Sequence, residues 1–250
     1  MFYAIINQLD KIVKIFPSPN ELAMNFAEKM ASMIARSSKN AEPFTIVLSG
    51  GTTPELLFKV LSENFAESVP WKFVHFFWGD ERCVPPDNDE SNYGMAQRKF
   101  LSRIEIPSGN IHRIRGEDDP ENEAARYSIE ILSSVRNRDR LPLFDLVILG
   151  LGEDGHTASI FPGHSELFDS DKICEVALHP VTGQKRITLT GRVINNADNV
   201  TFLVTGKTKA EIVENMFKKD SSVINFPASF IVPVYGKLNW YIDHDAGILI

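Results

Sequence analysis

Residues 44–54 of the chain read FTIVLSGGTTP, and this stretch decides the fold. Phe44 to Leu48 is a continuous apolar run of the length that suits a strand buried on both faces, and Ser49-Gly50-Gly51 after it reads as a tight turn. A helix is expected from Pro54 to about Asn64, because proline suits the first helical turn. A buried strand that turns directly into a helix is typical of an α/β protein.

The same alternation continues along the rest of the chain. Further buried strands are expected over 73–78, 144–149 and 199–204, and helices are expected after the capping pair Ser18 and Glu21, over 118–136 and from Ala210. Continuous apolar strands separated by helices imply a mostly parallel sheet with helices on both faces. No repeat or long linker interrupts this pattern, so residues 1–250 are expected to form one α/β domain.

Composition and charge exclude several classes of protein. The formal net charge of -7 argues against nucleic acid or an anionic membrane as the main partner, so an anionic ligand has to be held by local groups. Cys83 and Cys174 lie far apart, which favours reduced thiols over a disulfide framework or a zinc site. The first residues do not read as a signal peptide, and no apolar run has the length of a membrane span. We expect a cytoplasmic protein that is a monomer or a weak homo-oligomer.

Three of the expected strands end in unusual residues. These ends are Ser49–Thr53, Gly79–Arg82 and Gly150–His156. Ligands of open α/β sheets bind beyond the carboxyl ends of the strands. If the strands are parallel, the three ends converge on one edge of the sheet and form one site.

The first of these ends has the features of a phosphate-binding turn. The backbone N–H groups of Ser49, Gly50 and Gly51 can approach an anion closely, the hydroxyls of Thr52 and Thr53 add donors, and the following helix contributes its dipole. The alternative is a plain glycine turn in which a threonine caps the helix.

Gly150 to Gly155 matches the dinucleotide pattern G-x-G-x-x-G and follows an expected strand. Glu153 and Asp154 would however place carboxylates where a pyrophosphate must sit. Residues 162–163, proline and glycine, also cut short the helix that this pattern requires. A dinucleotide site is therefore not expected here.

His156 lies in this glycine-rich turn, two residues after Asp154, where neither packing nor helix periodicity calls for a histidine. A histidine beside a carboxylate can act as a general base near neutral pH. The alternative is a histidine at a helix start, satisfied by a backbone carbonyl. The other histidines show no metal-ligand spacing, and the chain has no G-x-S-x-G elbow, so neither metal nor serine-esterase chemistry is expected.

Basic residues at the strand ends are candidates for a phosphate clamp. They are Arg82, Lys185, Arg186 and Lys209, and Asp80 stands at the same strand end as Arg82. A solvated surface charge is the commoner fate of such residues. Position next to a strand end favours a functional role for Arg82, Arg186 and Lys209.

Taken in order, these motifs resemble the 6-phosphogluconolactonase family within the glucosamine-6-phosphate isomerase superfamily. The matching pieces are residues 48–54, 78–82, 91–93, 149–162, 186–190, 204–210, 227–228 and 240–243. They cover nearly the whole chain, and the run GEDGHTAS over 152–159 is highly specific.

The resemblance implies a Rossmann-like sheet of the isomerase/transferase type, with no metal and no organic cofactor. It also implies hydrolysis of 6-phospho-D-glucono-1,5-lactone to 6-phosphogluconate, the second step of the oxidative pentose phosphate pathway. His156 would be the general base on water, Asp154 would set its orientation and pKa, and Arg82 with the turn 49–53 would hold the substrate. Val181 stands where many of these lactonases carry a lysine, so the resemblance leaves open which basic residue closes the phosphate clamp.

Two rival functions remain. Glucosamine-6-phosphate isomerases share the glycine turn and the Asp-Gly-His core, but they typically carry a glutamate where this chain has Phe161, which cannot carry a proton. A non-catalytic sugar-phosphate sensor would keep the pocket without turnover. The presence of both Asp154 and His156 argues against a sensor.

Overall fold

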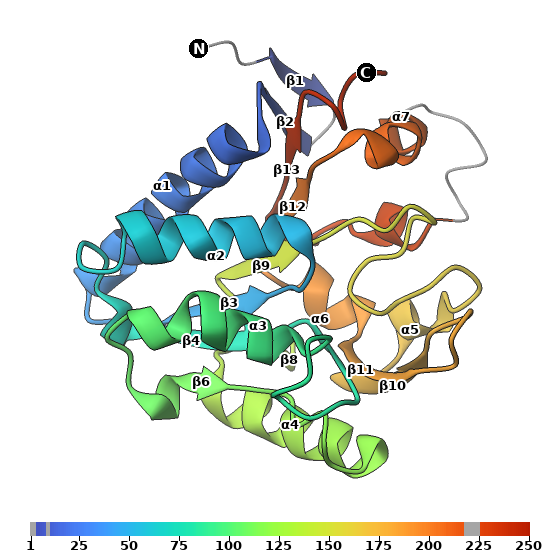
Figure 1. Ribbon diagram of the computed structural model, residues 1–250. Coiled ribbons are helices and arrows are strands. Elements are labelled where there is room, and N and C mark those ends of the chain that lie inside the picture. The colour runs from blue at the N-terminus through green and yellow to red at the C-terminus, as the bar shows by residue number, and fades with distance from the viewer. Residues whose placement is uncertain (1–3, 9–10, 218–225) are drawn as a thin grey trace.

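The computed structural model describes residues 4–8, 11–217 and 226–250, and an eight-stranded sheet forms its centre (Figure 1). In spatial order the strands are β1 (Ala4–Gln8), β2 (Lys11–Phe16), β13 (Lys237–Asp243), β12 (Asn199–Val204), β9 (Leu146–Leu149), β3 (Phe44–Leu48), β4 (Val74–Trp78) and β6 (Ile111–His112). Only the pairing of β1 with β2 is antiparallel, so the expected mostly parallel sheet is confirmed.

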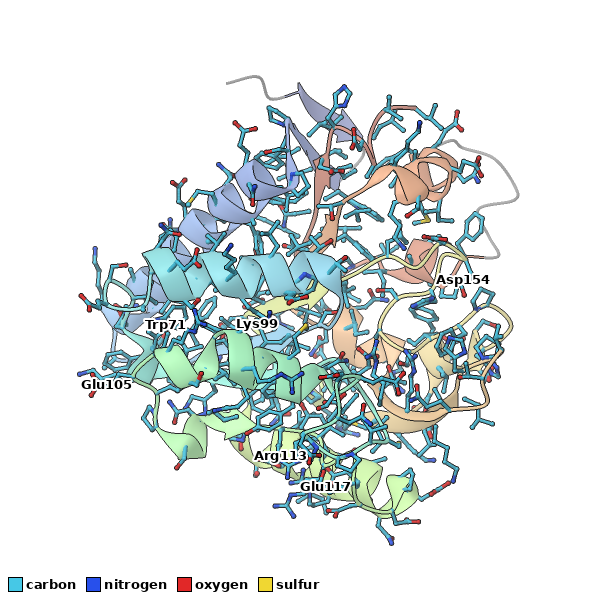
Figure 2. All side chains as sticks on the ribbon, viewed as in Figure 1. Trp71, Lys99, Glu105, Arg113, Glu117 and Asp154 are labelled. Carbon is cyan, nitrogen blue, oxygen red and sulfur yellow. The ribbon has the colours of Figure 1, made fainter. Side chains whose placement is uncertain are left out.

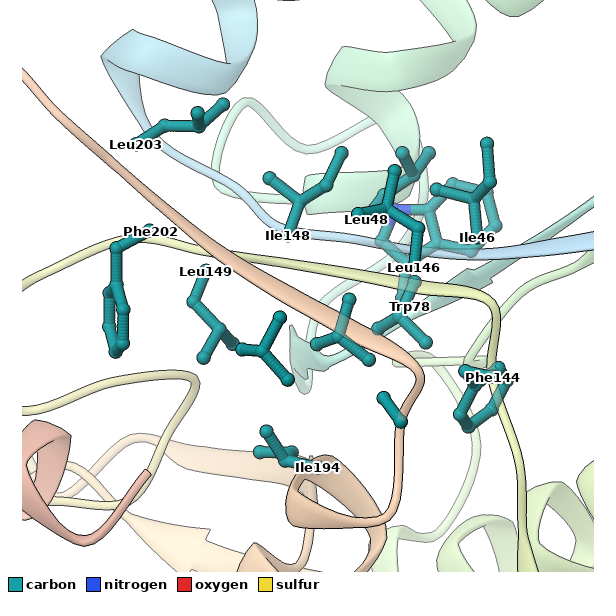
Figure 3. Packing of buried hydrophobic residues seen from close by; sticks show 14 of the residues in the cluster. Ile46, Leu48, Trp78, Phe144, Leu146, Ile148, Leu149, Ile194, Phe202 and Leu203 are labelled. Atoms are coloured by element: carbon teal, nitrogen blue, oxygen red, sulfur yellow. The ribbon is translucent and has the colours of Figure 1, made fainter. Parts of the chain in front are cut away.

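Helices flank this sheet on both faces. They are α1 (Pro19–Ser38), α2 (Thr52–Asn64), α3 (Asn92–Lys99), α4 (Pro120–Ser134), α5 (Glu166–Asp169), α6 (Gly191–Asn195) and α7 (Ala210–Phe217). Figure 3 shows Ile148 and Leu203 pointing to one face of the sheet, and Leu149 and Phe202 to the other, where α6 carries Ile194. Successive residues of a strand alternate between faces, so a sheet covered on both sides needs the uninterrupted apolar strands found in the sequence.

The inner strands form the core. Every residue of β3 and β9 is buried, and Val47 and Val147, which face each other in the register, are 0% exposed. Burying an aliphatic side chain of this size stabilises a fold by roughly 1.5–3 kcal/mol. These strands therefore form a rigid frame, and the turns that follow them are held in fixed positions.

The predicted helices are present, with small differences at their ends. Ser18 caps α1 and accepts a hydrogen bond from the Glu21 backbone N–H at 3.3 Å, as the capping pair predicts. α2 begins at Thr52, two residues before Pro54, since the first-turn N–H groups of a helix have no intrahelical partner and tolerate a proline. α4 and α7 lie where helices were expected.

The predicted strands are also present. β3 and β12 match their predicted bounds. β4 starts one residue late, because Trp71–Phe73 form a 3₁₀ turn. β9 starts at Leu146, two residues later than predicted. The Asp145 side-chain carboxylate accepts the Thr45 backbone N–H at 2.8 Å, where a regular strand pair would use a backbone carbonyl.

A second, three-stranded antiparallel sheet was not predicted. It consists of β10 (Cys174–Leu178), β11 (Lys185–Leu189) and β5 (Asp80–Arg82), and β7 (Asn137–Arg138) pairs separately with β8 (Leu141–Pro142). The sequence indicated Gly79–Arg82 only as the end of the preceding strand, whereas Asp80–Arg82 forms a strand of its own. This stretch forms a strand because β11 offers it an open edge, and the register places Arg186 opposite Arg82.

Both cysteines are free thiols, Cys174 buried and Cys83 partly so. In the part of the chain that the structure describes, no helix combines the length and the apolarity that crossing a membrane requires.

Candidate active site

The carboxyl ends of four neighbouring strands meet at one edge of the large sheet. Leu48 pairs with Trp78, and Leu149 pairs with Phe202, so the residues that follow β3, β4, β9 and β12 lie side by side. After β3 the chain continues to β4 on one side, and after β9 it returns to the sheet at β12 on the other side. The strand order therefore reverses between β3 and β9, and α/β sheets bind ligands at such a point. A cavity of about 200 Å³ opens at this place.

The cavity brings together most of the residues singled out in the sequence. Its wall includes the whole turn of residues 49–53, together with Asp80, Arg82, His156, Arg186 and Lys209. Asp154 lies behind His156, and Lys185 is not among the lining residues. The expectation that the three strand ends converge on one edge of the sheet is confirmed, because residues of all three line this one cavity.

His156 is held by its own loop. Its Nδ1 atom lies 2.6 Å from Oδ1 of Asp154, and the same oxygen accepts the His156 backbone N–H at 3.0 Å. The His156 carbonyl accepts the Gly152 N–H at 2.8 Å, which closes the loop on itself. No helix begins at this histidine, so the alternative of a helix-start histidine is wrong. Figure 2 shows Asp154 on the loop that leaves the sheet edge after β9.

Two glycines are needed for this loop. A Cβ atom on Gly152 would overlap the His156 ring and the Asp154 carboxylate. Gly155 has φ +82°, in the left-handed region that favours glycine, and a Cβ there would overlap the ring of Phe226. The Gly155 carbonyl also accepts the Ala228 N–H at 2.9 Å, so the segment after residue 225 holds the loop from outside.

The Asp154 carboxylate selects the tautomer of the His156 ring. Partial burial alone would raise the pKa of Asp154, but the hydrogen bonds from the His156 ring and backbone outweigh it and hold that pKa below its ordinary value. An ionised Asp154 can only accept, so Nδ1 of His156 donates to it, and the neutral tautomer selected by this contact carries its lone pair on Nε2. The His156 side chain is 29% exposed and lines the cavity, where this lone pair is available to a water molecule.

Arg82 and Arg186 form a pair of guanidinium groups in the wall of the same cavity. They stand opposite each other on β5 and β11, and the Nε atom of each is buried without a hydrogen-bond partner among the described residues. Burial and the nearby charge of Arg82 lower the pKa of Arg186. Two like charges and two unpaired buried donors are costly, and an anion in the cavity would offset both costs.

The glycine turn completes the wall. Gly51, with φ +102°, precedes α2 without a side-chain cap, so the first N–H groups of the helix are left for a ligand or solvent. Gly50 lies against the Asn92 side chain, which would overlap a Cβ atom at this position. The Thr53 hydroxyl is 2.7 Å from the Thr205 hydroxyl.

The two lysines differ in position. The Lys209 side chain is 23% exposed and lines the cavity, with Nζ 3.8 Å from a Glu153 carboxylate oxygen. Lys185 points elsewhere, and its Nζ pairs with Glu121 at 2.9 Å. Val181 lies between β10 and β11 and is 87% exposed.

Asp80 and Asn92 have roles that the motifs alone did not indicate. Asp80 is 5% exposed, and one of its carboxylate oxygens accepts the Ser159 hydroxyl at 2.6 Å, which ties β5 to the histidine loop. Asn92 lines the cavity and was not a predicted site residue, although the run Ser91-Asn92-Tyr93 is part of the family resemblance. Within the described ranges no group of three or more His, Cys, Asp or Glu side chains could hold a metal ion.

Comparisons with known proteins agree with this geometry. Residues 17–240 match a family model described as glucosamine-6-phosphate isomerases/6-phosphogluconolactonase. The chain is 42% identical to a 6-phosphogluconolactonase of Aggregatibacter actinomycetemcomitans over 91% of its own length and 97% of the relative. It is 42% identical to a 6-phosphogluconolactonase of Haemophilus influenzae over 90% and 95% of the two chains. The solved structure of 6-phosphogluconolactonase from Trypanosoma brucei superposes with a TM-score of 0.86 at 27% identity, covering 98% of this chain and 99% of that one.

Proposed function

The chain belongs to the family of glucosamine-6-phosphate isomerases and 6-phosphogluconolactonases, and from that premise we propose how it hydrolyses 6-phospho-D-glucono-1,5-lactone to 6-phosphogluconate. The observation that carries the mechanism is the 2.6 Å hydrogen bond between His156 Nδ1 and Asp154. This contact leaves Nε2 as a base in a cavity whose other wall is positively charged.

His156 is the general base. Nε2 takes a proton from water while the water oxygen attacks C1 of the lactone, and Asp154 stabilises the imidazolium that forms. The tetrahedral intermediate then breaks the bond between C1 and the ring oxygen, and the departing oxygen takes the proton from Nε2. One histidine thus acts as base and then as acid, and the open-chain acid leaves.

Arg82, Arg186 and Lys209 hold the phosphate, assisted by N–H groups of the turn 49–53. The unpaired Nε atoms of the two arginines support this assignment, because a phosphate dianion accepts from both and relieves their mutual repulsion. Within this proposal Arg186 closes the clamp, and Lys185, which pairs with Glu121, stays outside it.

At the position where glucosamine-6-phosphate isomerases carry their glutamate, the structure offers no acid for the isomerisation reaction. Phe161 is 1% exposed there, and its ring packs 4.9 Å from the His156 ring and 5.6 Å from the Arg186 guanidinium. A buried phenyl ring that contacts both the base and the cation occupies this place, so no carboxylate is present there to shuttle protons during ring opening.

The test is hydrolysis of freshly made 6-phosphogluconolactone, coupled to consumption of the product and corrected for spontaneous hydrolysis. Turnover well above the background rate is expected, without ammonia release from glucosamine 6-phosphate. Undiminished turnover is expected after exhaustive chelation. Binding of the product without turnover would favour a sensor, and activity restored only by zinc or magnesium would exclude the histidine-and-water mechanism.

We further propose that the reaction takes place in the cytoplasm, where two free cysteines stay reduced, and that the protein is a monomer or a weak homo-oligomer. Light scattering over a concentration series tests the second statement.

A further inference from the structure

Glu81 is a carboxylate buried directly behind the wall of the cavity. It lies on β5 between Asp80 and Arg82, which both line the cavity, and it is 2% exposed. Buried carboxylates are rare unless their oxygens are satisfied. The mechanism proposed above does not use this group.

Its two oxygens accept hydrogen bonds from a separate segment of the chain. Oε1 accepts the Asn92 N–H at 2.7 Å, and Oε2 accepts the Tyr93 N–H at 2.7 Å and the Ser91 hydroxyl at 3.1 Å. Oε1 also accepts the backbone N–H of Arg82 at 2.8 Å. One buried side chain thus fixes the start of α3 against β5.

The residues held in this way reach the cavity. The Asn92 amide donates to the Asp80 carbonyl at 2.9 Å, and its side chain packs on Gly50, the first glycine of the phosphate-binding turn. The Arg82 guanidinium donates to the carbonyl of Glu90, the residue just before the held segment. A shift of residues 90–93 would therefore move both the support of the glycine turn and the partner of Arg82.

We propose that Glu81 is a positioning residue for substrate binding: through Asn92 and Arg82 it sets the geometry of the phosphate clamp without touching the substrate. This inference rests on the proposed function, because it concerns the same cavity. It assigns Glu81 an effect on affinity and none on proton transfer at His156.

The protonation state of Glu81 should control this contact. Burial raises the pKa of Glu81 to about 7, and the neighbouring Asp80 raises it too, against the N–H donors of Tyr93, Asn92 and Arg82. The charged and titratable groups around it are Asp80 and Arg82 on β5, Arg186 on β11, and Cys83 and Tyr93. A protonated carboxyl presents an O–H where an acceptor is needed, so acid should loosen residues 91–93 and weaken binding.

The experiment compares Glu81→Gln with Glu123→Gln. Glu123 is also 2% exposed and accepts a backbone N–H, that of Arg115 at 2.8 Å, but it lies on α4 and does not line the cavity. Affinity for 6-phosphogluconate is measured by calorimetry, and KM and kcat are measured with the lactone. Glu81→Gln should weaken binding and raise KM about tenfold, with kcat within about twofold of wild type. Glu123→Gln should leave affinity, KM and kcat unchanged even if its melting temperature falls.

Two further measurements separate positioning from a general loss of structure. The effect of Asn92→Ala should not add to that of Glu81→Gln, because both variants break one chain of contacts. The affinity advantage of wild type over Glu81→Gln should shrink from about pH 8 to about pH 6, since only the wild type titrates at this position. If Glu81→Gln does not fold, Ser91→Ala removes one donor and should weaken binding about threefold.

Additive effects of Asn92→Ala and Glu81→Gln on binding would overturn the inference. So would a Glu81→Gln variant that binds 6-phosphogluconate as tightly as Glu123→Gln does. If Glu81→Gln does not fold, Ser91→Ala takes its place in this comparison. The calorimetric arm needs no turnover. A wild type that binds 6-phosphogluconate without hydrolysing the lactone would therefore refute the proposed function and still test Glu81.

Discussion

A histidine can take a proton from water only through an unprotonated ring nitrogen, and at residue 156 Asp154 selects that nitrogen. The carboxylate holds Nδ1 and leaves Nε2 to the cavity. The pair is separated by one glycine, so a local loop places it without help from a distant element. This is why the contact between the two residues could be predicted from the sequence alone.

His156→Asn should lower kcat about 10²- to 10⁴-fold, the usual contribution of a general base, and leave KM nearly unchanged. Asparagine keeps a donor near Asp154 but has no lone pair of comparable basicity. The melting temperature should change little, because the His156 side chain is partly exposed at the cavity. Steady-state kinetics and thermal unfolding check both statements. A folded variant with near wild-type kcat would mean that another group activates the water.

Arg186 and Lys185 are adjacent cations on β11, and successive side chains of a strand point to opposite faces. Arg186→Ala should raise KM for the phosphorylated lactone roughly 10- to 100-fold, because a charged hydrogen-bond partner of the phosphate is lost in ground state and transition state alike. Lys185→Ala is the matched control and should leave KM unchanged, since its partner is Glu121. Unphosphorylated gluconolactone should be a poor substrate of the wild type. Equal effects of the two substitutions on KM would show that the clamp is assigned wrongly.

At the scale of elements, the loop between β9 and residue 157 depends on the absence of a side chain at position 152. Gly152→Ala places a methyl group into the His156 ring and the Asp154 carboxylate, and a displacement of about 1 Å in a catalytic group can cost about 10²-fold in rate. We expect kcat to fall by about that factor. Gly109→Ala, at a glycine with no atom within 4 Å of the added methyl group, is the control and should be neutral. Unchanged kcat in Gly152→Ala would show that the loop adapts.

The large elements could be predicted because their signals are local. β3 and β12 are largely apolar runs followed by glycine-containing turns, and α1 carries its own cap at Ser18. The parallel order of the strands then brings their carboxyl ends to one edge, so the turn 49–53 and His156 could be placed in one site from the sequence.

The place of β5 in the small antiparallel sheet could not be predicted, because its pairing with β11 joins residues more than a hundred positions apart. Asp80–Arg82 is a short, charged stretch that looks like a turn until β11 lies beside it. The same pairing places Arg186 opposite Arg82, while Lys185 pairs with Glu121. Asn92 packs on Gly50, and its backbone N–H donates to the Glu81 carboxylate. Charge and spacing in the sequence carry no information on such contacts.

At the scale of the whole molecule, we propose that residues 1–250 form one domain that unfolds cooperatively. The buried apolar residues of both sheets and of α1 to α7 join in one hydrophobic cluster, which includes Leu22, Val47, Ile187 and Trp240. The buried carboxyl group of Glu81 contributes to this unit in a way that depends on pH, and this dependence can be measured on the whole protein.

The pKa of Glu81 in the folded protein is raised from 4.5 to about 7 by burial, so the folded state binds a proton between these values that the unfolded state has released. The stability that this group contributes is therefore fully present below about pH 4.5 and is lost as pH rises through about 7. One pKa unit corresponds to about 1.4 kcal/mol, so the interval from 4.5 to about 7 is worth roughly 3–4 kcal/mol. The free energy of unfolding in urea should be measured over this pH range for wild type and for Glu81→Gln, in which every other titrating group is shared. The stability of wild type relative to the variant should fall as pH rises from about 5 to about 8. If the stability of wild type relative to Glu81→Gln rises with pH instead, the N–H donors of Arg82, Asn92 and Tyr93 outweigh burial and keep the Glu81 carboxylate ionised. The pH dependence expected for substrate binding would then be absent as well.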